Sequence, residues 1–152
     1  MRAPITIAAL SLALLSPGGW TPAPTPPFDR AAGEVCDAPV HGEAVLDEVV
    51  EKSVPGGVVY KGALLVEVTN TATGASTEVD ASGSAYVTTG ADGAQTWYVA
   101  GPVLTGFRPG RGNLPRGLYR IDGVYVLEIA ADGYKTLTMI QGSTHDVCGD
   151  IE

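Results

Sequence analysis

Residues 117–141 read GLYRIDGVYVLEIAADGYKTLTMIQ, and this stretch decides the fold class. Its Tyr125, Leu127 and Ile129 alternate with the residues between them, and a period of two is typical of a half-buried β-strand. The dipeptides Asp122-Gly123 and Asp132-Gly133 contain the glycine that supplies the positive φ of a tight hairpin. The stretch therefore predicts strands at 117–121, 124–130 and 135–141, joined by short turns.

The same period of two continues towards the N-terminus. It predicts further strands at 58–69, 75–81, 84–89 and 95–100, with turn sequences at 69–74, 81–83 and 92–93. Many short strands, with a turn about every ten residues, are typical of sandwiches and barrels. We therefore expect an all-β fold: an antiparallel sandwich or barrel of about eight strands.

One segment, EAVLDEVVEK at 43–52, carries two patterns. Leu46, Val49 and Val50 fit one face of a helix, and Glu48 and Lys52 have the spacing of a helical ion pair. The valines and the strand-rich surroundings favour a strand instead. Strand is the preferred prediction and helix the alternative.

The N-terminal third divides by composition. Residues 5–15 are an unbroken apolar run behind Arg2, which indicates a secretory signal peptide over residues 1–19, with an uncut anchor as the alternative. The run is shorter than the roughly 20 apolar residues that span a bilayer, so no stable membrane span is expected. Residues 20–34 are rich in proline and predict an extended tether. The remaining residues, 35–152, form one predicted domain. Removal of the signal peptide would leave a mature chain that starts between Pro17 and Ala32.

Cys36 and Cys148 are the two cysteines of the chain, near opposite ends of the predicted domain. Export makes a disulfide between them the natural state, whereas two free thiols or a metal pair are the alternatives. Their lack of CxxC spacing argues against zinc, and no metal site is predicted. The disulfide would close the domain, and we expect it to bring the first and last strands side by side.

The charge excludes some partners. The chain has 9 Lys and Arg against 17 Asp and Glu, a net charge of −8, and such a surface repels nucleic acid and anionic lipid. Nothing in the sequence calls for a cofactor, and we expect a monomer.

Catalytic motifs are mostly missing from the sequence. It contains no GxSxG, HExxH, P-loop or dinucleotide fingerprint. His41 and His145 lie near the two cysteines, where a disulfide could bring them within reach of nearby carboxylates, but exposed chain ends explain them as well. A hydrolase would need a carboxylate pair, and no spacing distinguishes one among Asp47, Glu48, Glu51, Glu67, Glu78 and Asp80.

An arginine-rich stretch, RPGRGNLPRG at 108–117, is the main candidate for binding. With Arg120 it holds four of the nine basic residues, namely Arg108, Arg111, Arg116 and Arg120. Its prolines and glycines predict a long connection between strands. Guanidinium groups there can grip a carboxylate or phosphate, or they can offset the acidic surface of the protein itself, which is the favoured interpretation.

The neighbouring Trp97 and Tyr98 fall on opposite faces of one predicted strand. At least one of the two rings should therefore face solvent unless a second layer covers it. An exposed ring could stack on a sugar or anchor a partner, and Trp97 is the second binding candidate. A ring covered by its neighbours is the favoured interpretation.

Four segments together resemble a recurrent type of small secreted β-domain protein of high-GC Gram-positive bacteria. They are GALLVEVTNTATGASTEVDASG, GLYRIDGVYVLEIAADG, a terminal DVC and VCDAPV at the domain start. The resemblance implies a secreted antiparallel β-domain that opens with a strand, and it assigns no catalytic or binding residue.

The expected function is therefore that of an exported, non-catalytic β-domain that binds an extracellular partner or a cell-envelope polymer. A β-barrel that carries a small apolar ligand is the alternative, and a hydrolase is a third.

Overall fold

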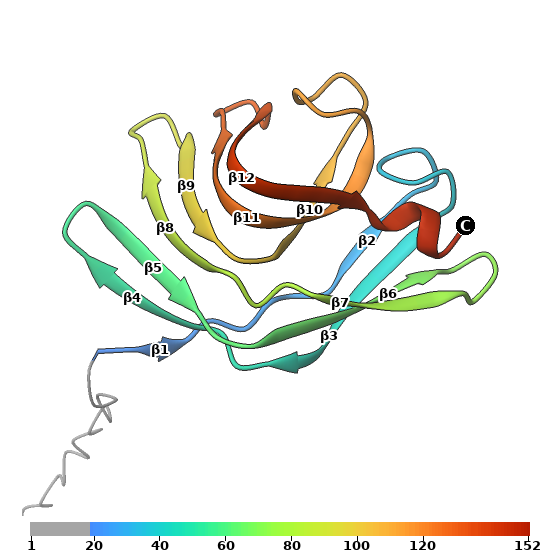
Figure 1. Cartoon of the computed structure of the whole chain (residues 1–152), viewed down its shortest axis with the longest axis horizontal. Coiled ribbons are helices and arrows are strands. Elements are labelled where there is room, and N and C mark those ends of the chain that lie inside the picture. The colour runs from blue at the N-terminus through green and yellow to red at the C-terminus, as the bar shows by residue number, and fades with distance from the viewer. Residues whose placement is uncertain (1–18) are drawn as a thin grey trace, which may run out of the picture.

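The structure, a computed structural model, describes residues 19–152, so the predicted signal peptide lies almost entirely outside it (Figure 1). The described residues fold into two antiparallel β-sheets with a single short 3-10 helix, η1 (Val147–Asp150), near the C-terminus. The predicted all-β class is confirmed. The two sheets make a sandwich-like fold, and the described strands do not close into a barrel.

The larger sheet has eight strands in the order β1-β4-β5-β8-β9-β11-β10, and β12 pairs with the other edge of β11. The bounds are β1 Thr21–Pro22, β4 Val50–Val54, β5 Gly57–Lys61, β8 Ser84–Thr89, β9 Gln95–Ala100, β10 Val103–Phe107, β11 Gly117–Ile129 and β12 Lys135–Asp146. Strand β11 is the axis of this sheet, because β10 and β9 pair with successive parts of one edge and β12 covers the other. The sheet curls strongly along these strands (Figure 1).

The smaller sheet has four strands in the order β2-β3-β6-β7. They are β2 Phe28–Arg30, β3 Val40–Asp47, β6 Leu64–Asn70 and β7 Ser76–Asp80. The chain crosses from one sheet to the other between β1 and β2, between β3 and β4, between β5 and β6, and between β7 and β8. The two sheets are therefore interleaved along the sequence and form one unit.

These crossings explain two differences from the predicted strands. The segment 43–52 is strand, as preferred, but it divides between β3 and β4 where the chain changes sheet. The predicted strand 58–69 likewise divides into β5 and β6 at Gly62, which has φ +134° and would place a Cβ 2.2 Å from the Glu48 carbonyl oxygen. Only glycine allows the two crossing segments to approach so closely.

The Asp132-Gly133 and Asp92-Gly93 turns join β11 to β12 and β8 to β9 as predicted. The predicted hairpin at Asp122-Gly123 is wrong, because β11 continues through it as one strand. Gly123 instead lies opposite Gly142 on β12, and a Cβ on Gly123 would lie 2.1 Å from the Gln141 carbonyl oxygen. The glycine pair therefore permits close contact between strands, and no turn forms there.

The predicted tether also differs from the structure. Within residues 20–34, β1 pairs with β4 and β2 pairs with β3, so this segment adds a strand to each sheet. Trp20 packs against the ammonium groups of Lys52 and Lys61, whose nitrogens lie 5.9 and 4.2 Å from its ring centre. Most prolines of this segment fall between the two short strands, where no ladder hydrogen bond is lost. The folded unit therefore begins before Val35.

Two apolar cores hold the sandwich together. The first packs the inner face of the smaller sheet against the disulfide and η1, and its buried members include Val40, Val68, Leu118, Val147 and Ile151. The second fills the concave face of the larger sheet, with Val99, Phe107, Ile121, Tyr125 and Leu127 buried. Leu114 of the arginine-rich loop packs on this second core. The loop is therefore anchored by one apolar side chain.

The disulfide between Cys36 and Cys148 is confirmed, with the two Cα atoms 5.4 Å apart. The expected pairing of the first and last strands is wrong, because β12 pairs with β11 and the N-terminal strands pair with β3 and β4. The cysteines lie in the loop before β3 and in η1. The disulfide therefore joins that loop to the C-terminal helix η1, and both cysteines are buried in the first core.

Candidate functional site

The arginine-rich segment forms the connection between β10 and β11, residues 108–116, as the sequence predicts. Three of its guanidinium groups meet acidic partners: Arg108 lies 3.2 Å from Glu34, Arg111 lies 3.8 Å from Asp132, and Arg116 pairs with Asp37. Arg111 also donates to the Asp132 carbonyl oxygen. The loop is thus held to the turn between β11 and β12 on one side and to residues 33–37 on the other.

A cavity of about 340 Å³ opens beside this loop, and basic side chains dominate its lining. Its charged members are Arg30, Arg108, Arg111, Lys135 and Asp132, and Val35, Gly106 and Gly133 complete it. Four of the nine Lys and Arg residues of an acidic chain therefore face one hollow. We call it the basic cavity.

Lys135 is the most enclosed cation of the basic cavity. Its Nζ donates to the Gly106 carbonyl oxygen at 2.6 Å and to the Thr105 hydroxyl at 3.0 Å, and it lies 5.6 Å from the Phe107 ring centre. Burial lowers the pKa of Lys135, and repulsion from Arg30 and Arg108 lowers this pKa further. Arg30 and Arg108 are thus close enough to repel the Lys135 ammonium group.

Arg30 enters the basic cavity from β2. Its guanidinium lies 5.3 Å from the Phe28 ring centre and donates to the Asp29 carbonyl oxygen at 2.8 Å. Among residues 19–152, neither Arg30 nor Lys135 has a carboxylate within 4.0 Å. Two of the four cations therefore remain uncompensated, which is an arrangement that an anion would relieve.

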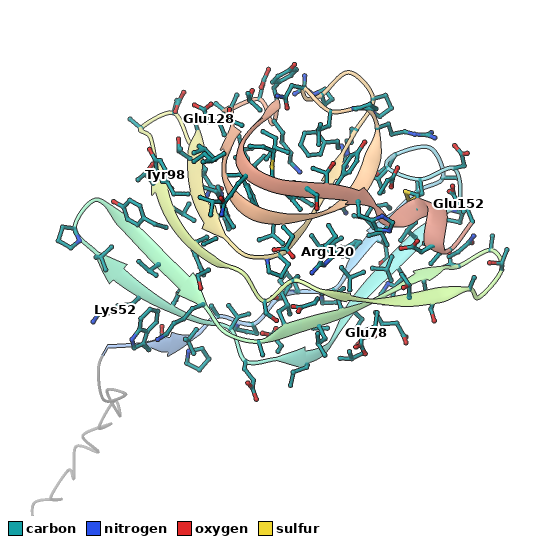
Figure 2. The ribbon with its side chains drawn as sticks, viewed as in Figure 1. Lys52, Glu78, Tyr98, Arg120, Glu128 and Glu152 are labelled. Atoms are coloured by element: carbon teal, nitrogen blue, oxygen red, sulfur yellow. A yellow bond between two sulfur atoms is a disulfide. The ribbon has the colours of Figure 1, made fainter. Side chains whose placement is uncertain are left out.

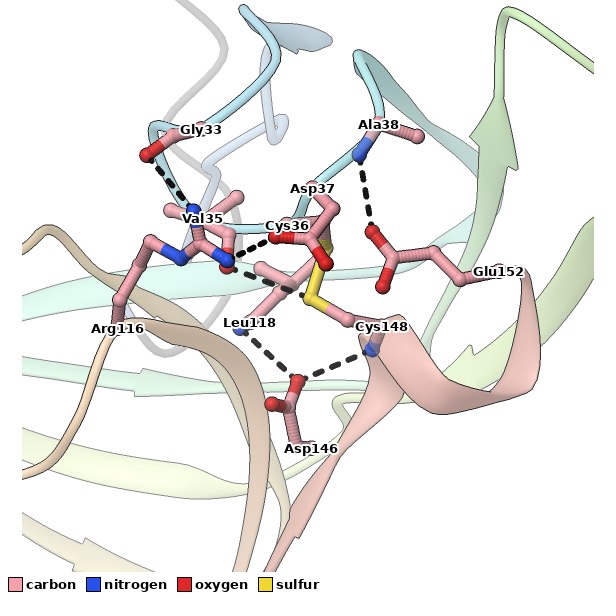
Figure 3. Close-up of polar contacts among 10 residues, drawn as sticks. All are labelled: Gly33, Val35, Cys36, Asp37, Ala38, Arg116, Leu118, Asp146, Cys148 and Glu152. Atoms are coloured by element: carbon pink, nitrogen blue, oxygen red, sulfur yellow. Dashed lines mark hydrogen bonds and ion pairs between the residues drawn. A yellow bond between two sulfur atoms is a disulfide. The ribbon is translucent and has the colours of Figure 1, made fainter.

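Three of the residues that the sequence singled out lie outside the basic cavity. Arg116 faces the disulfide region, where it pairs with Asp37 (Figure 3). Arg120 points towards the smaller sheet, donating to the Asp80 carbonyl oxygen and lying 3.2 Å from Asp122 (Figure 2). Trp97 stacks on Tyr60 with ring centres 5.8 Å apart and belongs to the second core. The structure therefore brings only Arg108 and Arg111 of the predicted residues together.

Sequence reasoning missed Arg30 and Lys135. Arg30 lay in the predicted tether, and it gave no signal that it would pair into a sheet. Lys135 did carry such a signal in the sequence, because it shares a strand face with Leu137 and Met139, both of which pack in the second core. A lysine on the inward face of a strand needs a polar partner or an anion, so its register was informative.

Polar contacts surround the disulfide on the neighbouring side of the loop (Figure 3). The Asp146 carboxylate accepts from the backbone N–H groups of Leu118 and Cys148, at 3.3 and 3.0 Å. The Glu152 carboxylate accepts from the backbone N–H of Ala38 at 2.9 Å. These carboxylates are engaged in holding the C-terminus, which gives them a structural role.

The two histidines do not meet. His41 lies 2.8 Å from Asp29 and 3.6 Å from Glu43, whereas His145 lies 2.8 Å from Asp150. The hydrogen bond that His41 donates to the Asp29 carboxylate raises the pKa of His41. Within residues 19–152, no group of three His, Cys, Asp or Glu side chains is arranged to hold a metal ion.

The outer face of the larger sheet carries an apolar hollow of about 390 Å³. Tyr98 is half exposed there and stacks on Tyr86 with ring centres 6.0 Å apart, and Val124 and Ile140 complete its exposed apolar wall (Figure 2). Trp97 and Tyr98 thus face opposite sides of β9, as the sequence predicts. Tyr98 is the ring left in solvent.

Comparison with known proteins returns no match: the chain matches no family model, no curated protein and no solved structure. In the described part of the chain, no helix has the length and apolar character needed to cross a membrane. Function is therefore inferred from the geometry and charge of the basic cavity.

Proposed function

We propose that this protein is an exported, non-catalytic β-domain that binds an anionic group of an extracellular partner or cell-envelope component in the basic cavity. One observation carries the proposal: four of nine basic residues line a single hollow in a chain of net charge −8. An acidic surface around a basic cavity would also repel polyanions, so the cavity would select a local anionic group.

The guanidinium and ammonium groups of the basic cavity are suited to binding. An arginine guanidinium group binds a carboxylate or a phosphate through two parallel hydrogen bonds, and a lysine ammonium group adds a point charge. Among the lining residues, Asp132 is the one carboxylate, and it lies 3.8 Å from Arg111; the lining contains no histidine, serine or cysteine. The positive hollow thus provides attraction for an anion without a nucleophile relay beside it.

Export is supported by the apolar run at residues 5–15 and by the disulfide. The alternative, a carrier of a small apolar ligand, has less support, because buried side chains fill the concave face of the larger sheet. The apolar hollow beside Tyr98 lies on the outer face instead.

The proposal is tested by NMR titration of the oxidised protein with acetate, sulfate and phosphate at constant ionic strength. At least one anion should shift the backbone amides of residues 105–108, 111–113 and 132–135. The double variant Arg30→Gln/Lys135→Met should lose these shifts.

The matched control is Arg116→Gln/Arg120→Gln, which removes the same charge outside the basic cavity and should keep the shifts. Thermal melting of both variants shows whether they remain folded. If no anion shifts the cavity amides, or if the two double variants respond alike, the basic cavity is not a binding site.

A further inference from the structure

The charge of the basic cavity indicates what kind of anion it holds. Four cations line the cavity and two carboxylates offset them, Asp132 in the lining and Glu34 beside Arg108, so the site carries 4 − 2 = +2. A carboxylate or a sulfate ester brings one negative charge, whereas a phosphate monoester brings about 1.5 to 2 at neutral pH. The phosphate monoester therefore offsets most of the charge in this lining.

The hydrogen-bond donors indicate the same ligand. Lys135 uses two of its three N–H groups on Gly106 and Thr105, which leaves one for a ligand. Within residues 19–152, Arg30 donates one hydrogen bond, to the Asp29 carbonyl oxygen, which leaves most of its five N–H groups for a ligand. A phosphate monoester has three strong acceptor oxygens for these donors, and a carboxylate has two.

A second hollow of about 160 Å³ adjoins the basic cavity and shares Arg30, Gly106 and Lys135 with it. Its other walls are Phe28, Leu104, Thr105 and Leu118, and polar atoms make up most of its exposed lining. The shared cations therefore stand at the junction of the two hollows. A ligand that uses both would have an oxyanion at one end and a small polar organic group at the other.

Gly106 makes this junction possible. A Cβ on Gly106 would lie 2.9 Å from the Val35 side chain, so the backbone of β10 approaches the loop before β3 closely at this point. The carbonyl oxygen of the same residue holds the Lys135 ammonium at 2.6 Å. Lys135 is thus fixed where the two hollows meet.

We infer that the ligand of this protein is a phosphate monoester, with the phosphate in the basic cavity and its small organic group in the adjoining hollow. The inference rests on the proposed function and adds the class of ligand. A sulfate ester, a free phosphate and a carboxylate are the competing anions.

The experiment is calorimetric titration of the oxidised protein at pH 8 and constant ionic strength. The probes are acetate, methyl sulfate, inorganic phosphate and glycerol 3-phosphate. We expect inorganic phosphate to bind at least tenfold more tightly than acetate or methyl sulfate, and glycerol 3-phosphate to bind at least threefold more tightly than inorganic phosphate.

A variant separates the two hollows. Leu104→Phe enlarges a wall of the adjoining hollow, and it should abolish the preference for glycerol 3-phosphate while inorganic phosphate binds as before. Lys135→Met should weaken both phosphate ligands at least tenfold, whereas Arg120→Gln should change neither.

The outcomes distinguish the two proposals. Binding of acetate or methyl sulfate as tight as that of phosphate would overturn the ligand class and leave an anion-binding domain. Equal affinity for phosphate and its ester in the wild type would overturn the role of the adjoining hollow. Absence of binding by all four probes would overturn the proposed function itself.

Discussion

Removal of the disulfide is expected to destabilise the protein strongly without preventing folding. The change is the double variant Cys36→Ala/Cys148→Ala, and Ala is chosen because both cysteines are buried among apolar side chains. The crosslink spans 112 residues of sequence. In the chain-entropy description, such a loop restricts the unfolded chain by an amount worth about 5 kcal/mol.

The expected loss is about 3 to 5 kcal/mol, since measured crosslinks often fall below the entropic value. A domain of this kind is stable by about 5 to 15 kcal/mol in total. The second core contains neither cysteine, and residues such as Tyr125 and Leu127 keep their packing on the concave face of the larger sheet. The variant should therefore still fold cooperatively.

Urea unfolding of the wild type and the double variant measures this loss, and thermal unfolding should show a drop of about 15 °C or more. Hydrogen exchange shows which residues lose stability. Protection should fall at residues 33–40 and 147–151 and persist in 117–129. A loss below about 1 kcal/mol, or a variant without any cooperative transition, would refute this account of how the two cores share stability.

Three further predictions concern the surface and the N-terminus. Glu67 on β6 faces Glu43 on one side and Glu78 on the other, so Glu67→Gln should raise the free energy of unfolding by about 0.5 to 1 kcal/mol at low salt, and urea unfolding that shows no gain there would contradict this. Because Asp29 raises the pKa of His41, the pairing of β2 with β3 is supported below pH 6.5, and this support is lost as pH rises through the folded pKa. NMR titration should find the pKa of His41 above 6.5 in the wild type and lower in Asp29→Asn. Finally, β1 begins at Thr21, so mass measurement of protein from the culture medium should show a chain that starts between Pro17 and Trp20, whereas full-length protein in the membrane fraction would argue against export.

The sequence alone determines the class of fold, because the relevant signals are local. Alternation places Tyr125, Leu127 and the residues like them on one face of a strand whatever lies beside it. The Asp-Gly turns at 92–93 and 132–133 form hairpins since glycine allows the backbone conformation there. The disulfide was predicted from the expected export and from the presence of only two cysteines.

The tertiary structure decides which strands pair. The dipeptide Asp122-Gly123 has the composition of a hairpin, yet the pairing of β11 with β12 on one side and with β9 and β10 on the other keeps it extended. Residues 20–34 look like a tether because proline disfavours long strands, but pairing with the free edges of β3 and β4 needs only two short strands, and β1 at a sheet edge accommodates Pro22. Long-range pairing overrides local preference at both places.

The candidate site illustrates the same division. The sequence placed Arg108 and Arg111 on a long loop, and local composition sufficed for that. It could not place Arg30 and Lys135 beside them, since their meeting depends on β2 joining the smaller sheet and on β12 following the edge of β11. The basic cavity exists because residues more than a hundred positions apart converge, and such convergence is determined by the packing of the two sheets.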